Sequence, residues 1–197
     1  MTAPAAILFD LGGVLLPFDR ERRVAAIVAR TGAEADAARA FMARDIHRRL
    51  DTGEANEFDL ASEFSDFFGV RVGPVEAGDL IASVFEPPND ALWKLADRLR
   101  SRVIVGGFSD NPALVRQVFP PQAFLEPLFL SCEIRACKPS AEAFAAVERG
   151  LGLAGGDILF IDDTAANVTA AQARGWDAIC FTSNAALVAE LAARGLP

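Results

Sequence analysis

The strongest constraint on the fold is an alternation of short apolar runs with longer helical patterns through the second half of the chain. The runs contain consecutive apolar residues rather than an apolar–polar alternation, which is typical of strands buried on both faces. Strands that alternate with helices predict a parallel sheet with helices on both of its faces, an α/β fold. The expected strands lie at residues 5–9, 103–105, 128–131, 158–161 and 178–181, and the later helices at residues 113–119, 141–151, 165–174 and 185–194.

A different pattern fills the segment between the first two expected strands. Apolar residues recur there at helical spacing, and glycines and prolines separate the repeats. The helices are expected at residues 20–30, 35–46, 59–68 and 79–85, with the return to the sheet beginning at residues 89–99. We therefore predict a core formed by residues 1–16 and 96–197, with residues 17–95 inserted as a helical cap.

The charge balance excludes two classes of partner. Lys and Arg number 19 against 27 Asp and Glu, so the net charge of the 197-residue chain is −8. A chain this acidic has no long-range attraction for nucleic acid or for an anionic membrane. No apolar run approaches the roughly 20 residues that span a bilayer, and the N-terminus lacks the basic start of a secretory signal. We expect a cytoplasmic protein that binds neither nucleic acid nor membrane, and its oligomeric state stays open.

The cysteines and the single histidine favour structural roles. Cys132, Cys137 and Cys180 make an odd number with no metal-type pairing, which predicts reduced and mostly buried thiols. His47 lies in a charged stretch beside two arginines and is expected to be a solvated helix residue. A Ser-His-Asp mechanism would depend on that one histidine, so the pattern does not favour it.

Asp10 is the first candidate catalytic residue, because it ends the apolar run at residues 5–9. Gly12 and Gly13 follow, and glycines let backbone amides and carbonyls approach a ligand closely. A carboxylate presented at the edge of a sheet in this way suits a nucleophile that forms a covalent intermediate. The alternative is an aspartate that only begins a turn.

Other polar residues follow later strands, where ligands of an open parallel sheet bind. Ser109, Asp110 and Asn111 come after the second expected strand, and Lys138 precedes the fourth. We expect Ser109 to donate to a phosphoryl oxygen and Lys138 to offset the charge of both aspartate and phosphate. Pro112 at the first position of a helix suggests a helix N-terminus that favours an anion. Taken separately, these residues are also compatible with a helix cap and a surface lysine.

Two adjacent carboxylates, Asp162 and Asp163, end the fourth expected strand. Adjacent carboxylates repel each other unless a cation lies between them. Asp10, Asp163 and the carbonyl of Gly12 would give Mg²⁺ the oxygen ligands that it prefers, with Asp162 behind them. The strand ends therefore carry the parts that phosphoryl transfer requires.

The chain resembles the haloacid dehalogenase superfamily of aspartate-nucleophile hydrolases, whose members have a Rossmann-like core. Four motifs carry the resemblance: Phe9 to Leu15; Ser109; Cys137-Lys138-Pro139 followed by Ala143-Phe144; and Phe160 to Asp163 followed by Asn167 and Gly175. The segment Leu50 to Glu54 with Phe58 is similar to the helical cap of one subgroup. The second motif departs from the family, because Gly106-Gly107-Phe108 is unusual and Asp110 stands where asparagine is common.

A further departure concerns the reaction itself. Most phosphatases of the superfamily carry a second aspartate two residues after the nucleophile as general acid and base, and this chain has Gly12 there. A subgroup that resembles sugar-1-phosphate phosphatases shares this Asp-Leu-Gly pattern. Without the second aspartate, the chain is expected to favour leaving groups that need little protonation and to hydrolyse the aspartyl-phosphate slowly.

Three activities remain open on these residues. The favoured one is a Mg²⁺-dependent phosphatase of a small phosphorylated metabolite. A 2-haloacid dehalogenase uses the same nucleophile without a metal, but Asp162 and Asp163 would repel its carboxylate substrate. The third is a protein without enzymatic activity, whose degenerate core binds a partner or phosphate without turnover. The substrate would be chosen by the cap, where Phe18, Arg22, His47 and Arg48 are candidates.

Overall fold

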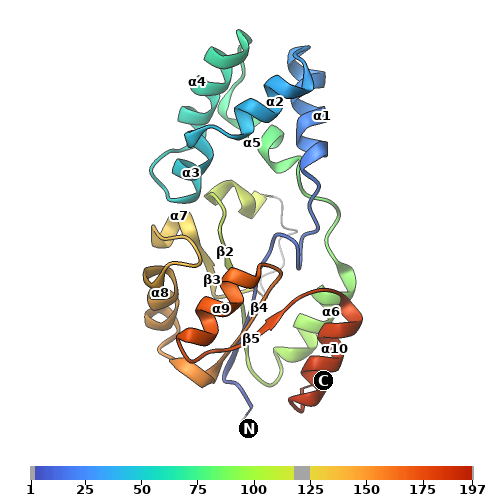
Figure 1. Ribbon diagram of the computed structural model, residues 1–197, viewed down its shortest axis with the longest axis vertical. Helices are drawn as coiled ribbons and strands as arrows, with labels where there is room; N and C mark the ends of the chain where they lie inside the picture. The colour runs from blue at the N-terminus through green and yellow to red at the C-terminus, as the bar shows by residue number, and fades with distance from the viewer. Residues whose placement is uncertain (1–2, 118–124, 197) are drawn as a thin grey trace.

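The structure, a computed structural model, describes residues 3–117 and 125–196. Its centre is a five-stranded parallel sheet of order β3-β2-β1-β4-β5 (Figure 1). The strands are β1 (Ala6–Phe9), β2 (Ile104–Ser109), β3 (Leu128–Leu130), β4 (Ile158–Asp162) and β5 (Asp177–Cys180). This arrangement confirms the expected Rossmann-like α/β class. The chain order reverses at β1, so the crevice beyond the carboxyl ends of β1, β2 and β4 is where a ligand is expected.

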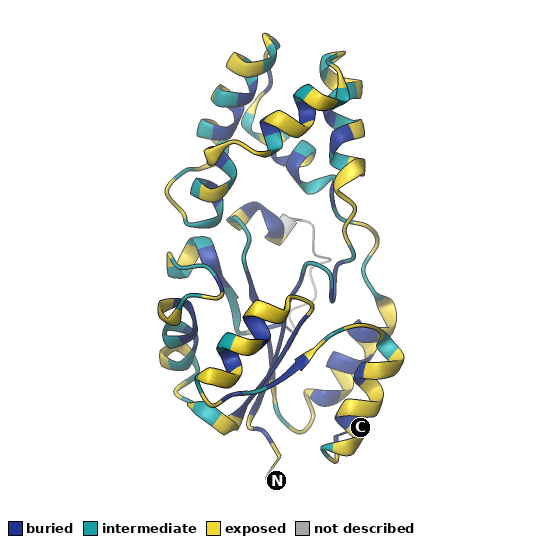
Figure 2. Cartoon of the chain, viewed as in Figure 1, coloured by how far each residue is buried: buried dark blue, intermediate teal, exposed yellow. Residues whose placement is uncertain are grey.

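Helices cover both faces of the sheet because successive strand residues point to opposite sides. Ile7 and Phe9 pack with α6 (Asp90–Leu99) and α10 (Asn184–Ala193), whereas Leu8 packs with α8 (Ala141–Leu151) and α9 (Ala165–Ala173). Figure 2 shows the strands as buried and the outer sides of the helices as exposed. The uninterrupted apolar runs of the sequence thus correspond to strands buried on both faces.

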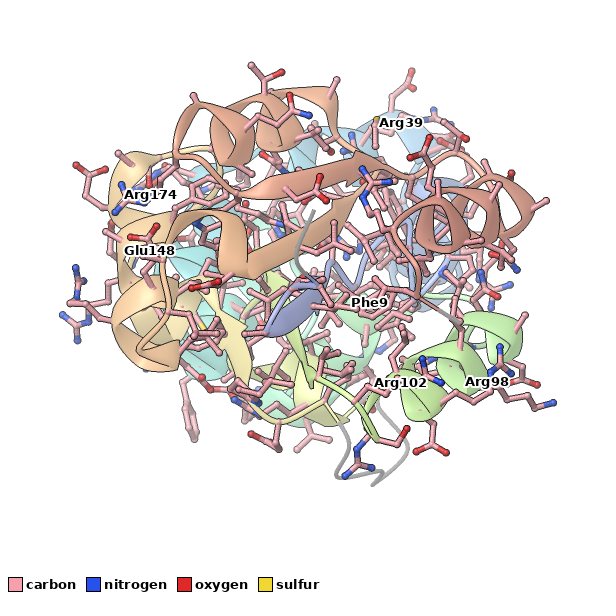
Figure 3. The ribbon with its side chains drawn as sticks, turned by 90° about the horizontal axis from the view of Figure 1, so that it is seen from below. Phe9, Arg39, Arg98, Arg102, Glu148 and Arg174 are labelled. Carbon is pink, nitrogen blue, oxygen red and sulfur yellow. The ribbon has the colours of Figure 1, made fainter. Side chains whose placement is uncertain are left out.

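Polar pairs join helices at the edges of the core. In Figure 3, which shows the molecule from below, Phe9 lies at the centre, Glu148 and Arg174 lie beside each other, and Arg98 and Arg102 lie near the opposite edge. The Arg174 guanidinium donates to both carboxylate oxygens of Glu148 at 2.9 and 2.6 Å. This pair connects α8 with the C-terminal end of α9, the helix that follows β4.

Five helices form the cap that Figure 1 shows above the sheet. They are α1 (Arg20–Thr31), α2 (Ala35–Met42), α3 (Asp45–Asp51), α4 (Glu57–Phe68) and α5 (Pro74–Ala82). Their apolar sides share one cluster that is separate from the sheet, with Phe41 and Phe64 fully buried and in edge-on contact at 5.1 Å. The described part of the chain has no helix that is long and apolar enough to cross a membrane.

The two connections between cap and core run beside each other. Phe18 and Phe85 form an antiparallel bridge, and the amide of Asp19 donates to Val84 at 2.8 Å. On the core side, Leu114 of the 3₁₀ helix η1 (Ala113–Gln117) packs into the cap cluster. The paired connections and Leu114 therefore hold the cap over the carboxyl ends of the strands.

Several element boundaries differ from the sequence predictions. The expected helix at residues 35–46 is two helices, with α3 beginning again at Asp45, and α5 lies earlier than residues 79–85. The expected helix at residues 113–119 is the short η1, and residues 118–119 lie outside the described residues. Two further short elements are α7 (Ser131–Ile134) and η2 (Gly155–Asp157). Because α6 packs with the sheet from Leu92 onward, we propose that the core resumes before Asp90 rather than at residue 96.

The second strand is longer than expected because it continues through Gly106 and Gly107 to Ser109. A Cβ at Gly106 would collide with the carbonyl of Pro127, and one at Gly107 would lie 2.6 Å from Leu128. The two glycines thus allow β3 and the residues before it to approach β2. The unusual second motif is part of a close-packed strand.

Candidate active site

Asp10 follows β1 directly, and the sheet holds its backbone: its amide donates to the carbonyl of Ile161 at 2.8 Å. Three donors converge on one carboxylate oxygen, Oδ1: the amide of Leu11 at 2.6 Å, the hydroxyl of Ser109 at 2.8 Å and the ammonium of Lys138 at 3.1 Å. No described residue donates a hydrogen bond to Oδ2. One oxygen of Asp10 is therefore fixed, and the other is available for chemistry.

Lys138 is a buried residue of the site and not a surface lysine. Its ammonium lies 2.7 Å from Asp162 Oδ2 and donates to the carbonyl of Phe108 at 3.1 Å, while its side chain is 1% exposed. Burial works against the charge, but the carboxylates of Asp10 and Asp162 outweigh it and raise the pKa of Lys138. The lysine is thus a fixed positive charge between two aspartates.

Asp162 is fully buried, and both of its oxygens accept hydrogen bonds. The amide of Thr164 donates to Oδ1 at 2.7 Å, and the side-chain amide of Asn167 lies 3.0 Å from Oδ2. These contacts and the one with Lys138 occupy both oxygens of Asp162. Asp162 therefore serves to hold the lysine in place. Its adjacent residue, Asp163, is exposed.

Asp10, Asp162 and Asp163 each place a carboxylate oxygen within 4.8 Å of the others. Gly13 makes room for this arrangement, because it has φ +76° and a Cβ there would collide with the Asp163 carboxylate. Burial, and then the charge of Asp162, raises the pKa of Asp163. A cluster that offers only carboxylate oxygens, with Oδ2 of both Asp10 and Asp163 free of hydrogen bonds from the described residues, fits Mg²⁺.

The environment of Asp10 tunes its protonation. Burial raises the pKa of Asp10, Lys138 opposes that effect, Asp162 adds to it, and the resulting pKa is about 6. At neutral pH the carboxylate is therefore mostly ionised, as a nucleophile requires.

The segment after β2 contributes polar groups beside Asp10. The Asn111 side chain donates to the hydroxyl of Ser109 at 2.9 Å, and Asp110 accepts the amide hydrogen of Lys138 at 3.0 Å. The expected helix after Pro112 begins as the five-residue 3₁₀ helix η1, and the amide of Asn111 donates to the hydroxyl of Ser131, so an anion site at this helix N-terminus stays a prediction. Ser109 thus orders Asp10 directly, and Asp110 orders the backbone of Lys138.

A cavity of about 570 Å³ lies between the cap and the core. The core side comprises Gly12 and the segment from Asp110 to Pro112, together with Leu114. The remaining lining residues come from the cap and its connections: Phe18, Arg20, Glu21, Arg23, Val24, Arg39, Met42, Ala43, His47, Leu50, Asp51, Ile81, Val84 and Phe85. Its size and mixed lining are typical of a small-molecule site.

The cap candidates divide into two groups. Phe18 and His47 line the cavity, whereas Arg22 and Arg48 are exposed and do not. Sequence reasoning missed Arg23 and Asp51, which line it. The signal for Asp51 was its position in the cap motif, and Arg23 had only its helical spacing from Arg20.

His47 is not a solvated residue as expected. Its Nε2 atom is buried with no hydrogen-bond partner among the described residues, and its ring meets Phe41 edge-on at 5.5 Å. Burial, and then the charge of Arg23, lowers the pKa of His47 to about 4. The ring is therefore neutral and faces the cavity.

The cysteines are free, as expected, but they are less buried than predicted. Cys132 and Cys137 are half-buried, and Cys180 is exposed. Burial raises the pKa of Cys132 to about 11, so this thiol is protonated at neutral pH.

A profile of the haloacid dehalogenase-like hydrolases matches residues 4–175. The chain belongs to this family. The match spans β1 to β4, the cap and all four sequence motifs. No curated protein matches the chain.

Solved structures give the same fold at low sequence identity. An HAD family enzyme from Bacteroides thetaiotaomicron is 22% identical with a TM-score of 0.83, over 93% of this chain and 96% of that one. A predicted HAD-like family hydrolase from Porphyromonas gingivalis has the same values for identity and TM-score, over 96% and 98%. L-2-haloacid dehalogenase from Xanthobacter autotrophicus, with chloropropionic acid covalently bound, is 17% identical with a TM-score of 0.62, over 96% and 83%. The resemblance to the sugar-1-phosphate phosphatase subgroup stays a prediction.

Proposed function

We propose that this hydrolase is a Mg²⁺-dependent phosphatase that acts on a small phosphorylated metabolite through an aspartyl-phosphate on Asp10. The observation that carries the proposal is the cluster of Asp10, Asp162 and Asp163, with Lys138 buried between the first two. A phosphate dianion can approach a carboxylate nucleophile only where positive charge offsets the repulsion between them. A lysine and a carboxylate site for a divalent cation supply that charge.

The roles of the residues follow from their contacts. The carboxylate of Asp10 would attack phosphorus while Ser109 and Lys138 orient it through their contacts with Oδ1. Lys138, Ser109, Asp110 and Asn111 would bind or orient the phosphoryl group from the strand ends. Ser109 and Asn111 are already hydrogen-bonded to each other, so they offer a preformed polar surface.

Asp10 and Asp163, with the carbonyl of Gly12, would hold Mg²⁺, and Asp162 would support them through Lys138. When bound, the ion would neutralise phosphoryl charge and orient the phosphate. The structural neighbour from Bacteroides thetaiotaomicron has been crystallised in complex with magnesium and inorganic phosphate, which supports this assignment.

The cavity supports a small organic group on the phosphate. Arg23 is half-buried there and donates from Nε to the carbonyl of Ile81 at 2.9 Å. Burial lowers the pKa of Arg23 to about 10, which still leaves the side chain charged at neutral pH. Polar oxygens of a metabolite would satisfy such a group better than an apolar substrate.

The test is hydrolysis of p-nitrophenyl phosphate with and without Mg²⁺, beside release of chloride from 2-chloropropionate. We expect phosphate release that excess EDTA abolishes and Mg²⁺ restores, with no chloride. Metal-independent chloride release would instead identify a dehalogenase, and neither reaction would identify a binding protein. A screen of phosphorylated metabolites would then name the substrate class.

A further inference from the structure

Gly12 leaves the proposed reaction without a carboxyl group at the position two residues after the nucleophile. The residue lies two positions after Asp10 and lines the cavity, and a Cβ there would meet only Phe18 at 3.7 Å. A side chain could therefore begin at this position without a clash, but the sequence has none there. A carboxyl group that protonates the leaving oxygen has to come from another position.

Asp51 enters the same cavity from the cap, at the last residue of α3. This end of α3 lies against the core, because a Cβ at Gly53 would collide with the carbonyl of Cys132 on α7. Cys137, the residue before Lys138, also contacts this end of the helix: its thiol lies 3.7 Å from the backbone carbonyl of Asp51. The cap thus presents Asp51 directly beside the third motif of the core.

The Asp51 carboxyl group has no hydrogen bond or ion pair from the described residues. The charged groups that influence it are Asp110 of the core and Arg23 on α1. Burial, then the negative charge of Asp110, raises the pKa of Asp51 to about 7, with Arg23 opposing. The thiols of Cys132 and Cys137, which Asp51 also influences, are protonated at neutral pH. Asp51 can therefore both hold and release a proton near neutrality.

Two other carboxyl groups line the cavity and are less suited to this role: Glu21 is paired with Arg39 at 2.7 Å, and Asp110 belongs to the core. Asp110 accepts the backbone amide hydrogen of Lys138 at 3.0 Å, and both that bond and the Lys138 charge favour its ionised form. When two carboxyl groups lie close together, the proton stays on the one whose negative charge is less well stabilised. Here that group is Asp51.

We propose that Asp51, carried by the cap, is the catalytic acid and base that Gly12 does not provide. The proposal rests on the proposed phosphatase function. In the first step Asp10 bonds to phosphorus, the bond from phosphorus to the leaving oxygen breaks, and the Asp51 proton goes to that oxygen. In the second step water bonds to phosphorus, the bond to Asp10 breaks, and Asp51 takes a proton from the water. The leaving alcohol and inorganic phosphate are released, and Asp51 is protonated again.

The proposal predicts a dependence on the leaving group. A nitrophenolate leaves without protonation, whereas the alkoxide of an alkyl phosphate does not. Loss of a general acid should therefore slow transfer mainly from the alkyl phosphate. The experiment measures the single-turnover rate of phosphoryl transfer with p-nitrophenyl phosphate and with glycerol phosphate. It compares wild type, Asp51→Asn and Asp51→Glu, with Asp45→Asn as the matched control. Asp45 lies on the same helix but is exposed and paired with Arg48.

We expect Asp51→Asn to slow transfer from glycerol phosphate about 10²- to 10⁴-fold and from p-nitrophenyl phosphate less than about tenfold. Asp51→Glu should retain part of the alkyl activity, and Asp45→Asn should match wild type. Adding Gly12→Asp to Asp51→Asn should restore alkyl transfer, because a carboxyl group then stands in the open position. A ¹³C titration of the aspartate carboxyl groups should show Asp51 changing protonation near neutral pH.

Two results would overturn the assignment. An equal loss on both substrates would make Asp51 a structural residue, and an unchanged alkyl rate in Asp51→Asn would show that another group donates the proton. A folding defect is recognised by the melting temperature and by the ¹³C titration, which needs no turnover. If wild type hydrolysed neither phosphate with Mg²⁺, the proposed phosphatase function itself would fail. The Asp51 variants test only the role of Asp51, because their effect is measured against an active wild type.

Discussion

The ammonium of Lys138 lies 2.7 Å from Oδ2 of Asp162, and both side chains are almost completely buried, at 1% and 0% exposure. Removing one partner of a buried ion pair leaves the other charge uncompensated. Lys138 also neutralises Asp10, so two buried carboxylates depend on this one cation.

We expect Lys138→Met to lower the free energy of unfolding by about 3–5 kcal/mol and to abolish phosphatase activity. Lys94→Met is the matched control, because Lys94 is exposed on α6 and should change unfolding by less than about 0.5 kcal/mol. Urea denaturation of both variants measures the difference. Equal effects of the two substitutions would contradict the central position that we give to Lys138.

Asp10→Asn should abolish turnover and leave the fold intact. An amide of the same shape cannot attack phosphorus, and loss of a nucleophile costs on the order of 10⁶ in rate. The measurement is steady-state hydrolysis of p-nitrophenyl phosphate, with mass spectrometry to exclude deamidation back to aspartate. Turnover near that of wild type in the intact variant would remove Asp10 from the mechanism.

Asp10 also predicts a pH dependence of stability. Its pKa is about 6 in the folded protein, above its ordinary value of 3.8, so the folded state binds the proton more tightly. The stabilisation from protonated Asp10 is complete below pH 3.8 and is lost as the pH rises through 6. Measured without Mg²⁺, the melting temperature of Asp10→Asn should therefore rise relative to that of wild type between these values. A constant difference across this range would contradict the proposed shift.

His47 should behave in the opposite direction. Because its pKa is lowered to about 4, its neutral form contributes stability that is present above pH 6.5 and is lost as the pH falls through 4. It is the only histidine in the chain, so one imidazole signal in an NMR titration reports it without assignment. Titration near pH 6.5 would show that the ring is solvated after all.

Gly13 and Gly12 form a matched pair for testing the carboxylate cluster. Gly13→Ala forces a side chain at φ +76° into the Asp163 carboxylate, so we expect lower stability and weaker Mg²⁺ binding by calorimetry. Gly12→Ala adds a Cβ at ordinary contact distance from Phe18 and should change the free energy of unfolding little. If both alanine variants bound Mg²⁺ as wild type does, Asp163 would not be a ligand at this position.

Much of the core could be predicted from the local pattern of apolar residues alone. Uninterrupted apolar runs specify strands buried on both faces, and parallel strands bring their carboxyl ends to one edge. This is why Asp10, Ser109, Asp162 and Asp163 were predicted together although they lie far apart in the chain, with Lys138 expected near them. The expected helix at residues 35–46 failed because the apolar periodicity continues across residues 43–44, where α2 ends and α3 begins.

The tertiary structure decided the properties that depend on burial and on distant neighbours. The chain itself determined the sheet, the order of the strand-end residues and the absence of a carboxylate at Gly12. Only folding shows that Lys138 is buried between two aspartates, that Nε2 of His47 is buried, and that Asp51 and Asp110 line the same cavity. A pKa depends on desolvation and on charges brought together from separate elements, and neither is encoded in the spacing of residues along the chain.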